Sequence, residues 1–269
     1  MKRNNYNGVV YYTFGNLAKK NKIKHLFSTR IGGVSEGKFK SMNLSFGTGD
    51  DRESVSENFR KISEIGFPIE KMVFSNQVHE DKIATVHGDD CGKGILRESD
   101  IIGADGLMTN TPGVVLVTFY ADCVPLYFYD PIKSVIALSH SGWRGTFLEI
   151  GKKTVLKMTE QFGSRPEDIF VGIGPSICKK CFEAGTDVAE KFAEKPGNLS
   201  QFIIKSTTAA DKYFIDLWGI NKQILIAASV PEQNIELPDL CTKCNPDIFF
   251  SHRAMGNNRG SMAAFLGIV

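Results

Sequence analysis

The amino-acid sequence predicts an α+β protein in which a layered α/β sandwich is built around a mixed, largely antiparallel β-sheet. Two observations point to this class. Strand-like runs are short and bounded by turn residues, and those between residues 113 and 139 follow one another with only tight turns between them. The 269 residues carry no fixed-period repeat and no long Pro/Gly/Ser linker. We therefore expect a single domain spanning residues 1–269.

The expected strands are rich in β-branched and aromatic residues, which suit a pleated and partly buried surface. They cover residues 9–13, 25–29, 72–74, 82–86, 113–120, 125–129, 135–139, 169–172 and 262–268. The segment 31–51 is rich in Gly and Ser and has no hydrophobic periodicity. Because loops of this length are uncommon in a compact domain unless they serve a function, we expect a functional loop there.

Helices are expected at residues 53–65, 147–162, 183–193 and 217–228. In the second of these, an apolar stripe is formed by Leu148, Val155, Leu156 and Met158. Asp216 stands where the N-cap of the fourth helix is expected, and Pro231 follows the end of that helix.

The balance of charges excludes some classes of partner. There are 32 Lys and Arg against 30 Asp and Glu, a net charge of +2, so nothing favours a nucleic acid or an anionic membrane. The first residues lack the apolar core of a signal peptide, and no run approaches the roughly 18 apolar residues of a membrane span. We expect a cytoplasmic protein whose six cysteines are reduced.

Three metal-competent side chains each follow an apolar strand. His79 comes after the run that ends in Asn76-Gln77-Val78, Cys123 lies in a turn bounded by Pro125, and His140 ends a buried run. His140 follows Cys123 by 17 residues, and the turn at residues 130–133 can fold the two intervening runs into a hairpin. The hairpin would bring Cys123 and His140 to the same edge of the sheet.

This set suits zinc, which accepts both imidazole and thiolate. Three protein ligands and one open position are typical of catalytic zinc, whose bound water has a pKa lowered to about 7. The alternative is that the histidines are hydrogen-bonded core residues and Cys123 is a small buried residue, and spacing alone does not decide between them. Two further features favour a site: the glycines that flank Trp143-Arg144, and Asp122, which either orients a ligand or only forms a turn.

Short motifs follow in a fixed order from about residue 25 to the C-terminus. They are Phe27-Ser-Thr-Arg30 with Gly32-Gly33, Met42-Asn43-Leu44, Gly49-Asp50-Asp51, Asn76-Gln-Val-His79, Ala104-Asp-Gly106, Ala121-Asp-Cys123-Val-Pro125, His140-Ser-Gly-Trp-Arg-Gly145, Gly172-Ile-Gly-Pro175, Cys181-Phe-Glu-Ala-Gly185, Asp216-Leu-Trp218, Cys241-Thr242 and Phe249-Phe-Ser-His-Arg253. The ordered set resembles the laccase-domain family, once described as multicopper polyphenol oxidases and now regarded as zinc-dependent purine nucleoside phosphorylases.

The resemblance implies a function and a ligand set. The family's metal ligands match His79, Cys123 and His140. Its members phosphorolyse adenosine, inosine and methylthioadenosine to the free base and ribose 1-phosphate, and they deaminate adenosine. We therefore expect an enzyme acting on small purine nucleosides and phosphate, as a monomer or a homodimer. Candidates for binding phosphate are Arg30 and Arg144, and candidates for binding sugar or base are Asn43 and Gln77.

The chain departs from the family pattern near its C-terminus. The usual Thr-Gly-Arg-Met motif is replaced by Arg259-Gly-Ser261-Met262, and the usual Tyr-Arg-Arg is replaced by His252-Arg253-Ala254. If these segments touch the substrate, the purine preference is affected.

Three other interpretations remain open. Copper at the same ligands would support weak polyphenol oxidase activity, although a four-copper laccase needs many more imidazoles than five histidines provide. Cys123 and His140 alone would suffice for a cysteine hydrolase. The pairs Cys178-x-x-Cys181 and Cys241-x-x-Cys244 are either plain reduced cysteines, a redox pair or a four-thiolate zinc site.

Overall fold

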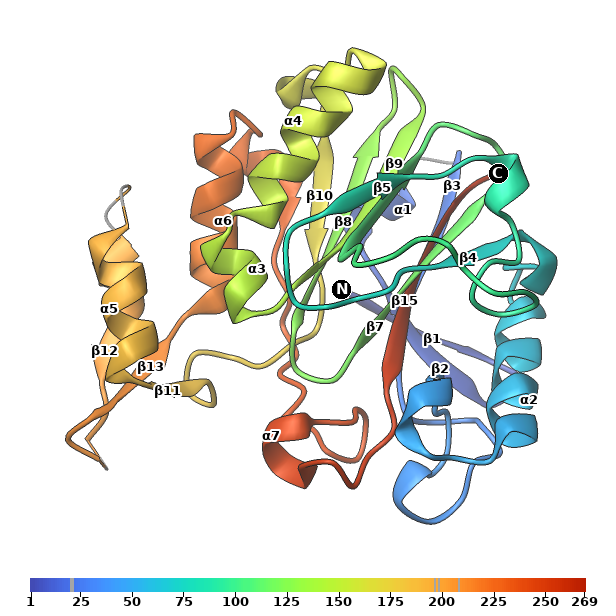
Figure 1. Ribbon diagram of the computed structural model, residues 1–269, viewed down its shortest axis with the longest axis horizontal. Coiled ribbons are helices and arrows are strands. Elements are labelled where there is room, and N and C mark those ends of the chain that lie inside the picture. Colours follow the sequence, from blue (N-terminus) through green and yellow to red (C-terminus); the bar gives the residue numbers. More distant parts are fainter. Residues whose placement is uncertain (20–21, 196, 198, 208) are drawn as a thin grey trace.

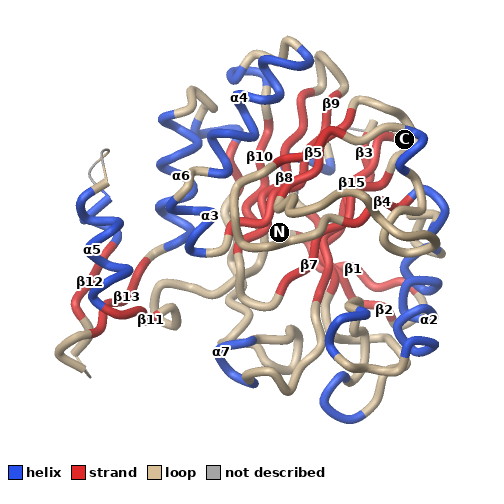
Figure 2. The backbone as a smooth tube through the Cα atoms, in the orientation of Figure 1, coloured by secondary structure: helices blue, strands red, loops and turns tan. Residues whose placement is uncertain are grey.

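Two six-stranded β-sheets lie face to face at the centre of the computed structural model, which describes residues 1–19, 22–195, 197, 199–207 and 209–269 (Figures 1 and 2). In spatial order, the first sheet consists of β1 (Lys2–Tyr6), β2 (Val9–Thr13), β3 (Ile23–Ser28), β15 (Met262–Ile268), β7 (Val115–Tyr120) and β4 (Met72–Phe74). The second consists of β14 (Ile235–Glu236), β10 (Phe170–Ile173), β8 (Val124–Asp130), β9 (Val135–Ser141), β6 (Gly106–Thr109) and β5 (Ile83–Thr85).

Most strand pairs in both sheets are antiparallel. The parallel pairs are β4 with β7, β5 with β6, and β10 with β14. The expected mixed, largely antiparallel α+β architecture is therefore confirmed. Its strands are divided between two large sheets and a small third one, rather than forming one sheet.

The alternation of side chains along β8 shows how the layers form. Val124, Leu126 and Phe128 face the helices outside the second sheet, whereas Tyr127 and Tyr129 point into the core between the two sheets. This period of two is that of a pleated strand. Because both faces are covered, all seven residues of β8 are buried.

Helices cover both outer faces of the paired sheets (Figure 1). On the second sheet lie α4 (Ile150–Phe162) and α6 (Leu217–Ala227), which pack through apolar residues such as Val155, Met158 and Ile220. On the first sheet lies α2 (Arg52–Ser63), which buries Val55, Phe59 and Ile62. The result is the layered sandwich, with the order helix, sheet, sheet, helix. The remaining helices are α1 (Gly15–Ala18), α3 (Trp143–Phe147), α5 (Thr186–Glu194) and α7 (His252–Met255).

The expected helix over residues 147–162 begins only at Ile150, where α4 starts, because Phe147 is the last residue of the separate helix α3. Glu149 has a left-handed backbone with φ of 58°, which interrupts the helix and changes the face that is buried. The expected apolar stripe is therefore wrong in part: Leu156 is 47% exposed and Leu148 only partly buried. The buried face of α4 consists of Ile150, Gly151, Thr154, Val155 and Met158.

Other helix boundaries differ less. The expected helix over 183–193 begins only at Thr186, because residues 183–185 form the strand β11 (Glu183–Gly185). Asp216 caps α6 as expected, since its side chain accepts a hydrogen bond from the Gly219 amide. The segment 31–51 is a loop with short 3₁₀ turns at Gly37–Phe39 and Phe46–Thr48.

A small third sheet stands beside the main sandwich, next to α5 (Figure 2). It is formed by β11, β13 (Lys212–Ile215) and β12 (Ile203–Lys205). Neither β12 nor β13 was expected, because both are short and mostly exposed or partly buried. In the part of the chain that the structure describes, no helix has the length and apolar character needed to cross a bilayer.

Candidate metal centre

The three expected ligands come from different strand ends. His79 lies in the loop after β4, Cys123 in the turn from β7 to β8, and His140 near the end of β9. The expected hairpin is present, because β8 pairs with β9 so that Pro125 lies opposite His140. Since β7 belongs to the first sheet and β8 to the second, Cys123 lies where the chain passes from one sheet to the other.

The structure brings the three side chains together. One donor atom from each of His79, Cys123 and His140 lies within 4.8 Å of the other two. The imidazole rings of His79 and His140 are 4.9 Å apart between centroids and almost perpendicular, at 85°. His140 is buried, Cys123 is partly buried and His79 is exposed, so the group opens to solvent on one side.

Gly142 leaves room for this group. A Cβ atom at this position would lie 3.4 Å from the His79 ring and 3.1 Å from the Cys123 Sγ, and the second distance is shorter than ordinary van der Waals contact. Gly142, two residues after His140, therefore allows the backbone to approach these side chains closely.

Asp105 holds two of the three ligands in place. Its buried carboxylate accepts hydrogen bonds from the amides of Val78, His79 and Glu80 at 2.9–3.0 Å. It also accepts the Nδ1–H of His140 at 2.7 Å, which leaves the Nε2 of His140 available to a metal. A carboxylate that orients a ligating histidine is a common feature of metal sites.

Sequence reasoning assigned no role to Asp105, although the motif Ala104-Asp-Gly106 marks the start of β6. The orienting role considered for the neighbour of Cys123 belongs to Asp105 instead. Asp122 accepts hydrogen bonds from the Thr242 hydroxyl and the Arg253 amide, both at 2.6 Å. It therefore ties the C-terminal segment to the turn that carries Cys123.

The electrostatics of the group favour a thiolate. Burial opposes ionisation of Cys123, but His140 and His79 outweigh it and hold the pKa of the thiol at about 6. Burial also disfavours a charged His140, but Cys123 and Asp105 raise the pKa of its imidazole to about 9. The pKa of Asp105 is lowered despite its burial, because His140 and the backbone amides of Glu80 and Val78 stabilise the carboxylate. The thiolate is the form of cysteine that binds metals.

Taken as a donor set, two imidazoles and one thiolate fit a zinc ion. Zinc accepts both donor types, and three protein ligands with an open side are typical of its catalytic sites. The arrangement of Asp105 supplies the carboxylate partner that such a histidine ligand usually has.

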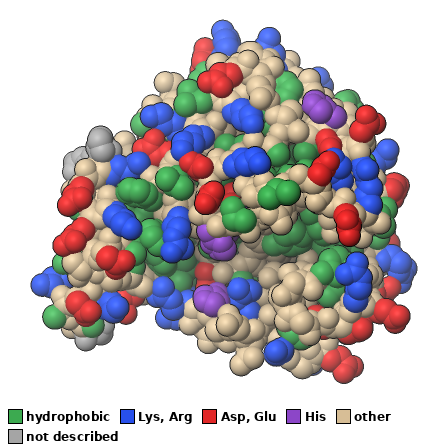
Figure 3. Space-filling model, in the orientation of Figure 1, with side chains coloured by type: hydrophobic (Ala, Val, Ile, Leu, Met, Phe, Trp, Pro, Cys, Tyr) green, Lys and Arg blue, Asp and Glu red, His purple; other side chains and the backbone are tan. Residues whose placement is uncertain are grey.

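Two cavities meet at the donor group. One, of about 550 Å³, is bordered by Trp143, Arg144, Phe182 and Arg253. The other, of about 490 Å³, is bordered by Phe46, Gln77 and Phe119. Both are lined by His79, Ala121, Cys123 and Arg259. Figure 3, drawn in the orientation of Figure 1, shows a hollow in the middle of the molecular surface, with histidine and Lys or Arg side chains beside it.

Two of the expected binding residues lie at these cavities. Arg144 lines the larger one, with its guanidinium carbon 4.5 Å from the Trp143 ring centroid. Gln77 lines the smaller one, but its amide is engaged with the backbone: Oε1 accepts from the Phe119 amide at 2.7 Å and Nε2 donates to the Phe119 carbonyl at 2.8 Å.

The structure does not bring Arg30 or Asn43 to these cavities. The Arg30 guanidinium donates to the carbonyls of Lys40 and Pro246, both at 2.8 Å, and stacks on Phe250. Asn43 is completely buried. Its Nδ2 donates to Ser45, Thr48 and Asp50, and its Oδ1 accepts from the amides of Ser45 and Ser261. Both side chains form hydrogen bonds with residues of the loop 31–51. Their contact with substrate stays a prediction.

Arg259 and Arg253 reach the site instead. Arg259 lines both cavities, and its Nη1 donates to the Gly260 carbonyl at 3.0 Å, while its buried Nε has no hydrogen-bond partner among the described residues. Arg253 lines the larger cavity. The signal was present in the sequence, since both arginines lie in segments where the chain departs from the family pattern.

Comparison with known proteins places the chain in a family. A family model described as multi-copper polyphenol oxidoreductase laccase matches residues 24–269. The chain belongs to this laccase-like family. Despite the family's description, the donor set of this laccase-like chain fits one zinc-type ion better than four coppers. Multicopper sites need many imidazoles, and among the residues that the structure describes only two of the five histidines belong to this donor group.

Relatives of this laccase-like chain carry two kinds of name. It is 35% identical over 244 residues to purine nucleoside phosphorylase YlmD of Bacillus subtilis, which covers 90% of this chain and 87% of that protein. It is 34% identical over 247 residues to adenosine deaminase RL5 of an unknown prokaryotic organism, covering 90% and 92%. The crystal structure of hypothetical protein YfiH from Bacillus licheniformis superimposes with a TM-score of 0.90 at 33% identity, covering 98% of this chain and 97% of that one.

Proposed function

We propose that this protein is a zinc-dependent purine nucleoside phosphorylase that acts on adenosine, inosine and methylthioadenosine and also deaminates adenosine. The observation that carries the proposal is the convergence of His79, Cys123 and His140 at the junction of two cavities bordered by arginines. The names of the relatives YlmD and RL5 support the same two reactions.

His79, Cys123 and His140 would hold the zinc ion. When bound there, zinc supplies a Lewis acid and lowers the pKa of water enough for attack on a purine carbon at neutral pH. The protein's own contribution is positional. Asp105 keeps His140 in the tautomer that turns Nε2 toward the site, and it fixes the backbone that carries His79.

Phosphorolysis needs a bound phosphate in line with the glycosidic bond. An oxygen of the phosphate attacks C1′ of the ribose, the C1′–N9 bond breaks, and the purine leaves with the bonding electrons and takes up a proton. Arg144, Arg253 and Arg259 can bind the phosphate, because they border the cavity next to the donor group and a guanidinium pairs well with phosphate.

The purine needs a flat apolar surface beside these charges. Trp143 and Phe182 border the larger cavity, and Phe119 borders the smaller one. Aromatic side chains stack on purine bases with little regard to their substituents, which suits an enzyme that accepts both adenosine and inosine.

The test is an assay of purified protein with adenosine or inosine, with and without phosphate, analysed by chromatography. We expect free adenine or hypoxanthine and ribose 1-phosphate only when phosphate is present, and inosine from adenosine in either case. The Cys123→Ala and His140→Ala variants should lose both reactions. The Cys91→Ser variant should retain both reactions. Among the described residues, Cys91 belongs neither to the group of His79, Cys123 and His140 nor to a second group formed by four other cysteines.

Other outcomes would replace the proposal. Equal release of base without phosphate would indicate a nucleoside hydrolase. Full activity after removal of the metal with a strong chelator would indicate that Cys123 and His140 act as a thiol–imidazole pair. Oxidation of phenols only after copper is added would indicate the polyphenol oxidase activity that the family description names.

A further inference from the structure

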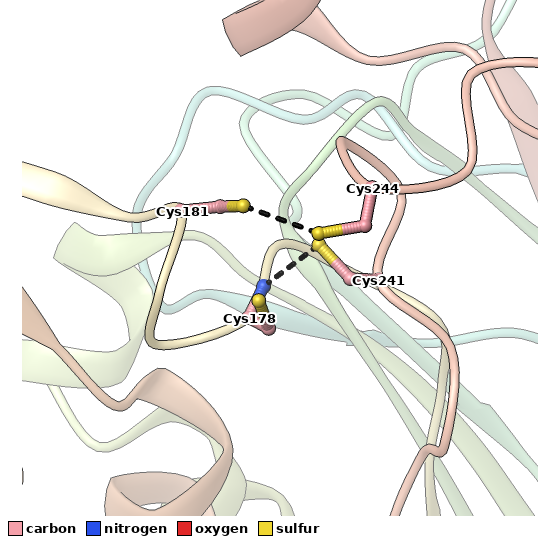
Figure 4. Close-up of side chains that lie close together, drawn as sticks. All are labelled: Cys178, Cys181, Cys241 and Cys244. Carbon is pink, nitrogen blue, oxygen red and sulfur yellow. Dashed lines mark hydrogen bonds between the residues drawn. The ribbon is translucent and has the colours of Figure 1, made fainter.

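Four cysteines outside the centre described above converge at one place. They are Cys178 and Cys181 from one Cys-x-x-Cys segment, and Cys241 and Cys244 from another (Figure 4). Their four Sγ atoms all lie within 4.8 Å of one another. The first segment follows β10 and the second follows β14, so residues about 60 positions apart in the sequence meet here.

The sheet explains why the two segments meet. Strands β10 and β14 are parallel neighbours, with Val171 opposite Ile235. Parallel neighbours end at the same edge of a sheet, so both segments leave from that edge. Beyond the strands, Ser176 still forms a parallel bridge with Cys241, and the Thr242 amide donates to the Ser176 carbonyl at 3.1 Å.

The sulfur positions match a tetrahedral metal site. Zinc–thiolate bonds of about 2.3 Å place the four sulfurs of a tetrahedron roughly 3.8 Å apart. The Sγ atoms of Cys181 and Cys244 are 3.4 Å apart, whereas a disulfide requires about 2.05 Å. The Cys178 amide points at the Cys241 Sγ at 3.3 Å, as the dashed line in Figure 4 shows, and such N–H donors stabilise a thiolate.

The charges in the two segments suit four thiolates around a divalent cation. Such a centre carries a net charge of −2, and the residues between the paired cysteines include Lys179, Lys180 and Lys243. Arg253 adds a further cation nearby, because its Nη1 donates to the Cys181 carbonyl at 3.2 Å. Nearby cations reduce the electrostatic cost of a negative centre that is partly removed from water.

We propose that Cys178, Cys181, Cys241 and Cys244 bind a second zinc ion with a structural role. The donor set is closed, since four thiolates occupy all tetrahedral positions and leave none for substrate. The ion would join two walls of the larger cavity. Phe182 and Glu183, which follow Cys181 directly, line that cavity together with Arg253.

Zinc content per chain tests the proposal, measured by elemental analysis of protein purified with reductant and without added metal. We expect about two zinc ions in the wild type. The Cys181→Ser Cys244→Ser variant should retain about one, and the Cys91→Ser control should retain both. A Cys123→Ala His140→Ala variant should also retain about one, so the result does not depend on the function proposed for the other centre.

A second measurement identifies the ligands while Cys178, Cys181, Cys241 and Cys244 are left unchanged. In the Cys123→Ala His140→Ala background, X-ray absorption at the zinc edge should show about four sulfur neighbours at roughly 2.3 Å, and Co²⁺ should give thiolate-to-metal charge-transfer absorption. A metal-free protein in this background would overturn the proposal. So would a Cys181–Cys244 disulfide, detected as a loss of two hydrogens by mass spectrometry of unreduced protein that lacks zinc.

Discussion

At the scale of single residues, the sharpest prediction concerns the carboxylate of Asp105. It accepts three backbone amides and the His140 Nδ1–H. The Asp105→Asn variant replaces an acceptor with an NH₂ group that faces donors, so each amide left unpaired should cost about 1–3 kcal/mol of stability. We expect zinc affinity, measured by competition with a chelator, to fall about 10–100-fold. Asp81→Asn, which removes only a partly exposed ion pair with Lys153, is the control. Equal zinc affinities in the two variants would contradict the role of Asp105.

Substitutions of Arg259 and Arg30 can be compared directly, because Arg259 lines the two cavities and Arg30 does not. Lys retains the charge of Arg259 but not its bidentate geometry. Arg259→Lys should therefore raise the KM for phosphate about tenfold, which corresponds to roughly 1.4 kcal/mol, with unchanged zinc content and little change in deamination. Arg30→Lys should leave this KM unchanged and lower the melting temperature, because it loses contacts with Lys40, Pro246 and Phe250. A raised KM for phosphate in Arg30→Lys, together with an unchanged KM in Arg259→Lys, would indicate that Arg30 binds the phosphate.

At the scale of elements, the junction between β9 and α3 is where backbone approaches the ligands most closely. A Gly142→Ala methyl group would crowd the Cys123 Sγ, and a ligand displaced by even a fraction of an ångström lowers the rate. We expect at least about a tenfold loss of kcat/KM, with the fold retained by circular dichroism. Gly88→Ala is the control, since a Cβ there meets nothing within 4 Å. Wild-type kinetics for both variants would show that the ligands tolerate the methyl group.

Elements differ in how far their sequence determines them. The contact between Cys123 and His140 is predictable, because a short hairpin of two apolar strands places its ends together. The position of His79 beside them is predictable only through the family resemblance, because it depends on hydrogen bonds to Asp105, a residue 26 positions away in the sequence. The strand β1 is not predicted from the sequence, because most of its residues are polar and exposed at the edge of a sheet. The break at Glu149 is not predicted either, because a non-glycine residue in the left-handed region is uncommon.

At the scale of the whole molecule, the candidate centre depends on the packing of one sheet on the other. Cys123 lies where the chain crosses between them, and His140 belongs to the second sheet, while His79 follows a strand of the first. The core between the sheets therefore sets the distance between the ligands. This explains why no single segment of the sequence carries the site, although each ligand follows a strand.

That same core contains a buried histidine, which predicts an acid sensitivity of the whole fold. His25 on β3 contacts the rings of Phe14 and Tyr127, and its Nε2 accepts the Phe14 amide at 2.8 Å. Burial lowers the pKa of this imidazole from 6.5 to about 4. The unfolded chain therefore binds more protons between these pKa values, so the stabilising contribution is complete above about pH 6.5 and is lost as the pH falls toward 4.

The His25→Gln variant isolates this term, because a glutamine carbonyl can accept the Phe14 amide without titrating. Both proteins should be unfolded with denaturant at about pH 7.5 and about pH 4.5. Between these values, the free energy of unfolding of the wild type should fall by about 2–3 kcal/mol more than that of the variant. Taking the difference between the two proteins removes the contributions of all groups that are the same in both. If the free energy of unfolding falls equally in the two proteins, His25 is protonated in the folded state, and the core between the sheets accommodates a charged imidazole.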